Sequence, residues 1–198
     1  MLYLASQSPR RLELLRQLGI EPGLLEVSVP EMRLPGELPR DYVSRVAREK
    51  AGAGLLRVMS NPDALVLGAD TEVVLDGHVL GKPADETAAA NMLAELAGRT
   101  HSVISVVWLL SASRELRAES VSEVRLAALN AEALAGYVAT GEWRGKAGGY
   151  AIQGRAATFI EHLSGSFSGV MGLPLHETAG LLRAFGRTDL LYPVKGAP

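Results

Sequence analysis

The chain has 198 residues, of which 47% are hydrophobic and 21% are charged, a composition typical of a folded protein and unlike a disordered one. Its net charge of −2 supplies no general positive field, which argues against a surface that holds nucleic acid or an anionic membrane by charge. The sequence contains no cysteine, which excludes disulfides, thiolate catalysis and cysteine-based zinc sites.

Cellular location and domain organisation follow from the same features. No basic N-terminal flank precedes a long apolar core, and the longest apolar run, residues 103–110, is far shorter than a membrane span. We therefore expect a cytoplasmic protein. No break in composition marks a linker, and the length suffices for a sizeable core, so one domain over residues 1–198 is predicted.

Residues 2–11, LYLASQSPRR, predict a strand, a tight turn and the start of a helix. Ser8 fits the N-cap position and Pro9 the first helical position. A helix N-terminus favours anions through its free N–H groups, and Arg10 and Arg11 add donors suited to phosphate oxygens. The alternative is an ordinary capped helix with two solvated arginines, so the functional interpretation depends on matching features further along the chain.

The next elements are predicted from periodicity and turn residues. We expect strand pieces and loops over residues 22–39, a helix over 41–56, a strand over 64–69, and a hairpin of strands 72–75 and 78–80. The strand ALVLGA is continuously apolar, as in strands covered on both faces. Asp76-Gly77 is a strong signal for a two-residue hairpin loop.

The second half of the chain also alternates between predicted helices and strands. We expect a helix over residues 85–97, antiparallel strands over 101–110 and 116–128, a helix over 131–138, a Gly-rich stretch over 141–154, a strand over 158–163, a loop over 164–169 and a last helix from Pro174 to near Gly186. Helices that alternate with strands and antiparallel hairpins indicate an α/β fold with a mixed sheet.

Three more motifs carry polar groups suited to a phosphorylated ligand. GADT places Asp70 and Thr71 just past the end of a strand, where a carboxylate can hold a hard cation or activate water. GKP places Lys82 near Asp70, and Gln153 in the Gly-rich stretch has the donor and acceptor needed to read a nucleobase. The alternatives are a turn-capping Asp70, a solvated lysine and a flexible loop. The four histidines have no metal-ligand spacing and are interpreted as structural or solvated.

Taken together and in this order, the motifs resemble the Maf family of nucleoside triphosphate pyrophosphatases. The similarity runs nearly from end to end, through LASQSPRR, REKA, LGADTEVVLDGHVLGKP, MLAELAGRTHSV, YVATGEWRGKAGGYAIQG and VMGLPLHET. The resemblance implies hydrolysis of a nucleoside triphosphate between the α- and β-phosphates. It also implies a fold similar to inosine triphosphatase, with an elongated mixed sheet flanked by helices and two lobes around a central cleft. AGGYAIQG resembles the branch that acts on dTTP and UTP rather than 7-methyl-GTP, with modified pyrimidine nucleotides as further substrates.

The resemblance also implies roles for individual residues. Asp70 matches the family's proposed proton acceptor, and Glu31 matches its second acidic residue. Whether Glu31 binds a metal or assists the attacking water is left open. The phosphate-binding positions of the family match Ser8, Arg10, Arg11, Lys50 and Lys82. Arg10, Thr71 and Gln153 match positions associated with base choice, and Ser105 stands where a threonine is usual.

Cofactor and partners are implied in the same way. We expect a divalent cation, Mg²⁺ or Mn²⁺, with oxygen ligands, because the sequence offers no histidine or cysteine cluster. A nucleoside triphosphate substrate and a homodimer are expected, without nucleic-acid or membrane partners. The alternative function is a non-catalytic, nucleotide-sensing regulator of cell division.

Overall fold

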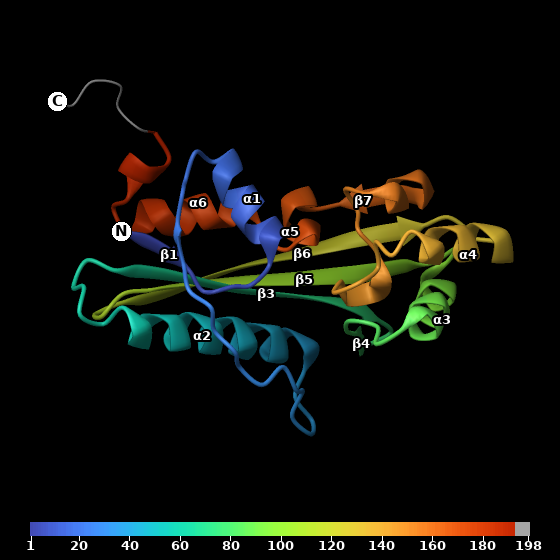
Figure 1. Cartoon of the computed structure of the whole chain (residues 1–198), viewed down its shortest axis with the longest axis horizontal. Helices are drawn as coiled ribbons and strands as arrows, with labels where there is room; N and C mark the ends of the chain where they lie inside the picture. The colour runs from blue at the N-terminus through green and yellow to red at the C-terminus, as the bar shows by residue number, and fades with distance from the viewer. Residues whose placement is uncertain (193–198) are drawn as a thin grey trace.

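The fold is built on one mixed β-sheet with helices on both faces (Figure 1). The computed structural model describes residues 1–192. Within them the strands are β1 (Leu2–Leu4), β2 (Gly23–Leu24), β3 (Leu65–Leu75), β4 (His78–Leu80), β5 (Thr100–Leu110), β6 (Glu115–Leu126) and β7 (Ile160–Ser164). The helices are α1 (Pro9–Gln17), α2 (Pro39–Arg57), α3 (Glu86–Leu96), α4 (Ala131–Ala139), α5 (Phe167–Met171) and α6 (Leu175–Ala184). Short 3-10 helices are η1 (Ala147–Gly149), η2 (Arg155–Phe159) and η3 (Thr188–Leu190).

Strand β3 connects all parts of the sheet, whose order is β2-β1-β3-β5-β6-β7 with β4 also beside β3. On one edge of β3, β1 pairs in parallel with residues 65–67 and β4 pairs antiparallel with residues 73–75. Within the described chain, residues 68–72 therefore have no strand partner on that edge, although β5 pairs with residues 66–74 on the other. Open α/β sheets bind ligands outside the carboxyl ends of their strands, and the carboxyl end of β1 lies at this gap.

The hydrophobic core divides the molecule into two lobes that share the long strands β3, β5 and β6. At one end, Leu4 and Leu15 from the first strand and helix pack with Leu182 of α6. At the other end, Leu93 of α3 packs with Tyr137 of α4. These helix pairs stand at opposite ends of the sheet in Figure 1. The mixed sheet, its flanking helices and the two lobes confirm the predicted fold class.

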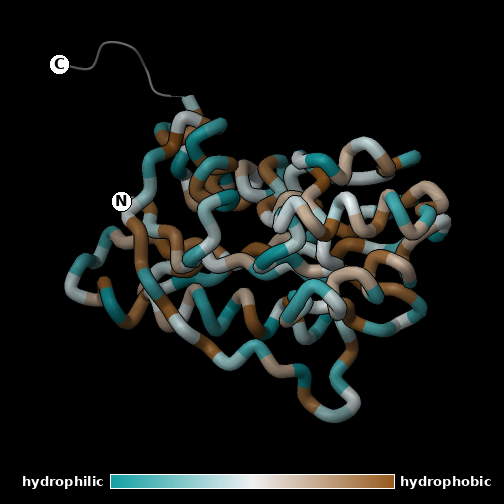
Figure 2. The backbone as a smooth tube through the Cα atoms, turned by 45° about the vertical axis from the view of Figure 1, so that its right-hand side comes forward, coloured by the Kyte–Doolittle hydropathy of each residue, from teal (hydrophilic) through white to brown (hydrophobic). Residues whose placement is uncertain are grey.

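Helix α2 covers the opposite face of the sheet from α1, α5 and α6 (Figure 1). Its buried residues Val43, Val46 and Ala47 pack against Val106 of β5. The helices alternate between hydrophobic and hydrophilic segments along the chain (Figure 2), as expected where only one face of a helix packs on a sheet.

Several local predictions need correction. Ser8 is the N-cap of α1, but its hydroxyl makes no capping hydrogen bond. Asp70 and Thr71 lie in the middle of the continuous strand β3, not past its end, because β5 pairs with β3 through both residues. The expected loop over 164–169 contains the start of α5, whose first turn is capped when Ser166 accepts a hydrogen bond from the Gly169 N–H.

The remaining elements agree with prediction to within a few residues. The strand expected from residue 158 begins later, after the 3-10 helix η2. The turn at Asp76-Gly77 has φ values of 50° and 80°, as a two-residue hairpin requires. One domain over residues 1–198 remains a prediction, and its residues 193–198 lie outside the described part of the chain.

Candidate active site

A cavity of about 630 Å³ lies between the two lobes, beside the unpaired edge of β3. Its wall combines the turn between β1 and α1, the middle of β3, the segment after β4 and the Gly-rich stretch before η2. All nine residues singled out from the sequence line it, namely Ser8, Arg10, Arg11, Glu31, Lys50, Asp70, Thr71, Lys82 and Gln153. The fold therefore brings together residues up to 145 positions apart in sequence, while their individual roles remain predictions.

The close approach of α2 to β3 delivers Lys50 to the site. A Cβ atom at Gly68 would lie 2.4 Å from the carbonyl oxygen of Ala47, so only glycine lets the helix pack this near the strand. Lys50 lies one turn further along α2 and is buried. Its Nζ donates a 2.8 Å hydrogen bond to Oδ1 of Asp70, two residues beyond Gly68 on the strand.

Two lysines and two carboxylates form a continuous ion-pair chain across the cavity wall. Lys50 Nζ lies 2.6 Å from Oε1 of Glu31, and Lys82 Nζ donates a 2.7 Å hydrogen bond to Oε2 of the same residue. Burial opposes ionisation of Glu31, but the hydrogen bonds from both lysines outweigh it and lower its pKa to about 2. Glu31 is therefore ionised at neutral pH and holds both lysines at the cavity.

The two N-terminal arginines join α1 to the segment after α5. Arg11 is buried and donates through Nε to the Gly172 carbonyl at 2.8 Å, and through Nη1 to Ser6 Oγ at 3.2 Å. Arg10 donates through Nε to the Met171 carbonyl at 3.3 Å. Burial and the adjacent positive charge of Arg11 lower the pKa of Arg10, so an anion bound beside them would stabilise both guanidinium groups.

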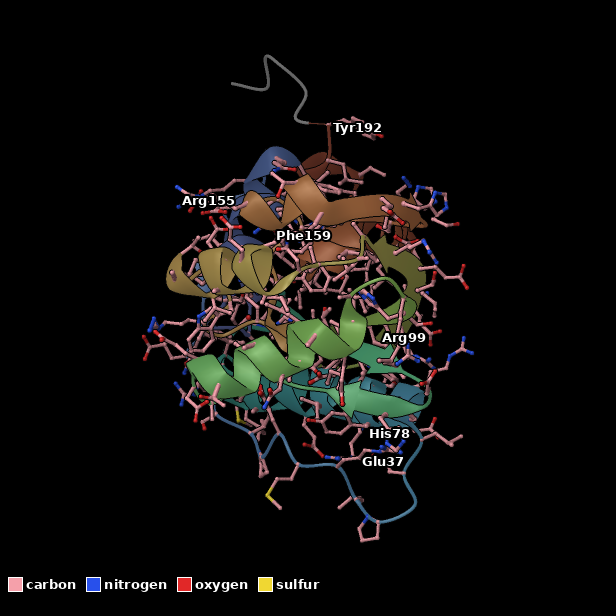
Figure 3. The ribbon with its side chains drawn as sticks, turned by 90° about the vertical axis from the view of Figure 1, so that its right-hand side faces the viewer. Glu37, His78, Arg99, Arg155, Phe159 and Tyr192 are labelled. Carbon is pink, nitrogen blue, oxygen red and sulfur yellow. The ribbon has the colours of Figure 1, made fainter. Side chains whose placement is uncertain are left out.

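The Gly-rich stretch is anchored on both sides of Gln153, which itself lies exposed on the cavity rim. On one side, Tyr150 OH lies 2.8 Å from His101 Nε2, and the Ala151 N–H donates to Tyr137 OH at 3.0 Å. On the other, the Arg155 N–H donates to Oε2 of Glu142 at 2.8 Å. Figure 3 views the end of the molecule that carries this region and labels Arg155. These hydrogen bonds tie the stretch to neighbouring elements on both sides of Gln153.

Sequence reasoning missed one acidic residue of the site, Glu72. It lines the same cavity and is buried. Burial and the neighbouring carboxylate of Asp70 raise its pKa to about 8. The signal that could have found it is strand alternation, since residues two apart on β3 face the same side.

The fold and cavity define an α/β protein whose central site sets arginines and lysines beside buried carboxylates. A family model described as "Maf-like protein" matches residues 1–185, and the chain belongs to this family. It is 58% identical to a dTTP/UTP pyrophosphatase of Xanthomonas campestris over 188 residues, which cover 94% of this chain and 99% of the relative. It is 54% identical to a nucleoside triphosphate pyrophosphatase of Xylella fastidiosa over 186 residues, covering 93% and 98% of the two chains. Among solved structures, the Ham1 protein of Staphylococcus aureus is 11% identical, with a TM-score of 0.49 over 95% of this chain and 98% of that one.

Proposed function

We propose that this protein hydrolyses nucleoside triphosphates between the α- and β-phosphates, releasing the monophosphate and pyrophosphate, and that dTTP and UTP are its preferred substrates. The observation that carries the proposal is how the two carboxylate oxygens of Asp70 are hydrogen-bonded. Lys50 holds its Oδ1, whereas Oδ2 is buried at a cavity wall with no hydrogen-bond partner in the described chain. Relatives at 54–58% identity that bear pyrophosphatase names support the same reaction.

In this mechanism Asp70 orients the attacking water and accepts its proton at Oδ2. The ion pair with Lys50 fixes the carboxylate, so little reorganisation is needed when the water attacks the α-phosphorus. The oxygen bridging the α- and β-phosphorus atoms leaves with the pyrophosphate. Positioning and charge stabilisation account for most catalysis in phosphoryl transfer, so this mechanism requires no covalent nucleophile from the protein.

Three cationic side chains would bind the triphosphate. Arg10 and Arg11 lie at the start of α1, where the helix N-terminus also favours an anion. Lys82 approaches from the segment after β4, and its partner Glu31 has 37% of its side-chain surface exposed. A phosphate would compete with Glu31 for Lys82, so we infer that substrate binding rearranges this ion pair.

Base choice would fall to Thr71 and Gln153, with Arg10 nearby in the same cavity. Gln153 has an amide that both donates and accepts, as recognition of a thymine or uracil edge requires. Its anchored loop keeps this side chain at the rim, which supports recognition of a specific base.

The site also fits a divalent cation. The unpartnered buried oxygen of Asp70 has two lone pairs, so one could bind a hard cation such as Mg²⁺ or Mn²⁺ while the other accepts from the water, and Glu31 is already committed to two lysines. Within residues 1–192, no group of three or more His, Cys, Asp or Glu side chains could hold a metal, so substrate phosphates and water would complete the shell. A bound cation would neutralise charge on the phosphates.

Product analysis tests the reaction. We expect dTTP and UTP with Mg²⁺ or Mn²⁺ to give monophosphate and pyrophosphate in equal amounts. Release of orthophosphate and a diphosphate would contradict cleavage at the α–β bond. Tight nucleotide binding without turnover would identify a nucleotide sensor instead.

Homodimer formation and a cytoplasmic location are further proposals that follow from the family. Light scattering coupled to size exclusion tests the dimer. In the described part of the chain, every helix is too short or too polar to cross a membrane.

A further inference from the structure

Asp70 and Glu72 lie two residues apart on β3, so their side chains leave the same face of the strand. Both are almost fully buried, with 5% and 7% of their surface exposed, and both line the cavity. Oδ2 of Asp70 and Oε2 of Glu72 each lack a hydrogen-bond partner in the described chain. The middle of β3 thus carries two buried carboxyl groups, two residues apart, that each have an oxygen without a hydrogen-bond partner among the described residues.

Among the described residues, neither lysine of the site makes a hydrogen bond or ion pair with Glu72. Lys50 donates to Asp70 and contacts Glu31, and Lys82 pairs with Glu31. A carboxylate that is buried without a donor destabilises the folded state. A bound cation would supply the partner that the buried Glu72 carboxyl group lacks among the described residues.

We propose that Glu72 is a ligand for the divalent cation, which it shares with Asp70 and binds before the nucleotide arrives. The proposal deepens the function proposed above and rests on it for the cation's role. Residues two apart on a strand are about 6.6 Å apart along its axis, so flexible carboxylates can converge on one small cation. The ligand set is all oxygen, which matches Mg²⁺ or Mn²⁺ rather than a softer metal.

Binding of Mn²⁺ alone tests this inference. Free Mn²⁺ is followed by its paramagnetic resonance signal as it is titrated into nucleotide-free protein. We expect Glu72→Gln to weaken binding by about tenfold or more relative to the wild type. The matched control is Glu177→Gln on α6, because Glu177 also has a buried, unpartnered Oε2 but lies outside the cavity. This control should bind Mn²⁺ like the wild type.

Thermal unfolding gives a second readout. In EDTA, the wild type and Glu72→Gln give the reference unfolding temperatures from which each protein's response to Mn²⁺ is measured. Added Mn²⁺ should raise the unfolding temperature of the wild type more than that of the variant. A purely structural Glu72 predicts that Mn²⁺ raises the unfolding temperature of the two proteins equally.

Three results would overturn the inference: unchanged Mn²⁺ affinity in Glu72→Gln, equal loss in Glu177→Gln, or no Mn²⁺ binding by the nucleotide-free wild type. Pyrophosphate release is measured separately on the same wild-type sample. Glu72-dependent binding without turnover would leave the inference standing and refute the proposed function. Turnover without Glu72-dependent Mn²⁺ binding would refute the inference and leave the proposed function standing.

Discussion

Thr71 Oγ1 and Ser105 Oγ lie 2.7 Å apart on the adjacent strands β3 and β5. Ser105 donates its only hydroxyl proton to the Gly169 carbonyl, at 2.6 Å. Thr71 must therefore be the donor in its pair with Ser105, because a hydroxyl has one proton. A ligand in the cavity then meets the Thr71 oxygen only as an acceptor.

This relationship predicts a specificity effect of Ser105→Ala. Removing the serine hydroxyl frees the Thr71 proton, so Thr71 can donate to a ligand as well as accept. Uracil and thymine carry an N–H at ring position 3, whereas cytosine has an acceptor there. We expect the ratio of kcat/KM for UTP over CTP to fall by roughly tenfold, as for loss of one discriminating hydrogen bond.

Ser122→Ala is the matched control for that experiment. Ser122 is a buried serine on β6 that donates to the Ser166 carbonyl and lies outside the cavity. Its substitution should leave the UTP/CTP ratio unchanged. An equal loss of activity on both nucleotides in Ser105→Ala would show that Ser105 serves folding alone.

Asp70→Asn should abolish turnover while nucleotide binding is largely kept. The amide is close in shape to the carboxylate but cannot accept the water proton. Loss of a general base lowers kcat by about 10²–10⁴-fold. Steady-state kinetics with dTTP, combined with calorimetric binding of a non-hydrolysable analogue, measures both quantities. A variant that keeps about half of the wild-type rate would rule out the base role, since that loss is far below this range.

Lys82→Ala should weaken activity on every triphosphate, because phosphate is common to all of them. Loss of one charge-assisted contact is worth roughly 1.5–3 kcal/mol. Arg11→Ala should also lower activity on every triphosphate. Because Arg11 donates hydrogen bonds to Gly172 and Ser6 as well, the thermal stability of this variant has to be measured alongside its activity.

A nearby surface cation provides the control for Lys82. Arg99 pairs with Asp76 at the turn between β3 and β4 and lies outside the cavity. Arg99→Ala should retain wild-type kcat/KM on all nucleotides. If Lys82→Ala altered only the preference among bases, its phosphate role would be wrong.

The sequence was sufficient to predict which residues line the cavity. It was not sufficient to predict that Asp70 and Thr71 lie in the middle of a continuous strand. Gly68 to Thr71 resembles a strand end because glycine and aspartate are disfavoured in strands. In the structure, pairing with β5 continues through these residues, and Gly68 is needed for the contact with α2. Both effects depend on segments distant in sequence, which local propensity does not reveal.

Glu72 and α5 were missed for different physical reasons. A single glutamate in a strand is usually solvent-facing, and only the gap between β1 and β4 shows that this one faces a cavity. SGSFSG has low helix propensity, so α5 depends on the Ser166 cap and on its contact with the arginines of α1. The mixed sheet was easier to predict, since it follows from long alternating segments, whereas the two lobes were implied by the family resemblance.

Gln153→Ala should reduce the differences among dTTP, UTP, CTP and 7-methyl-GTP more than it lowers the best rate. A side chain that hydrogen-bonds one base rejects analogues that leave it unpaired. The alternative, in which Gln153 only stabilises its loop, predicts an equal loss on all four nucleotides. Measurement of kcat/KM for the four substrates on both proteins distinguishes these outcomes.

The burial of His101 predicts how stability depends on pH. Burial lowers the pKa of His101 to about 4, below the value of roughly 6.5 for an unfolded histidine. Between these values the unfolded chain binds more protons than the folded one, so the stabilisation present above pH 6.5 is lost as the pH falls toward 4. At about 1.4 kcal/mol per pKa unit, the loss from His101 amounts to roughly 3 kcal/mol.

His101→Gln tests that dependence, because glutamine can still hydrogen-bond to Tyr150 but does not titrate. We expect the variant to lose less unfolding free energy than the wild type between pH 7 and pH 4, measured by urea denaturation in EDTA. His162→Gln, at an exposed position on β7, should follow the wild-type curve. If His101→Gln also followed the wild-type curve, His101 would be protonated as readily in the folded protein as in the unfolded chain. The side chain that contacts Tyr150 beside the cavity would then carry a charge at acidic pH.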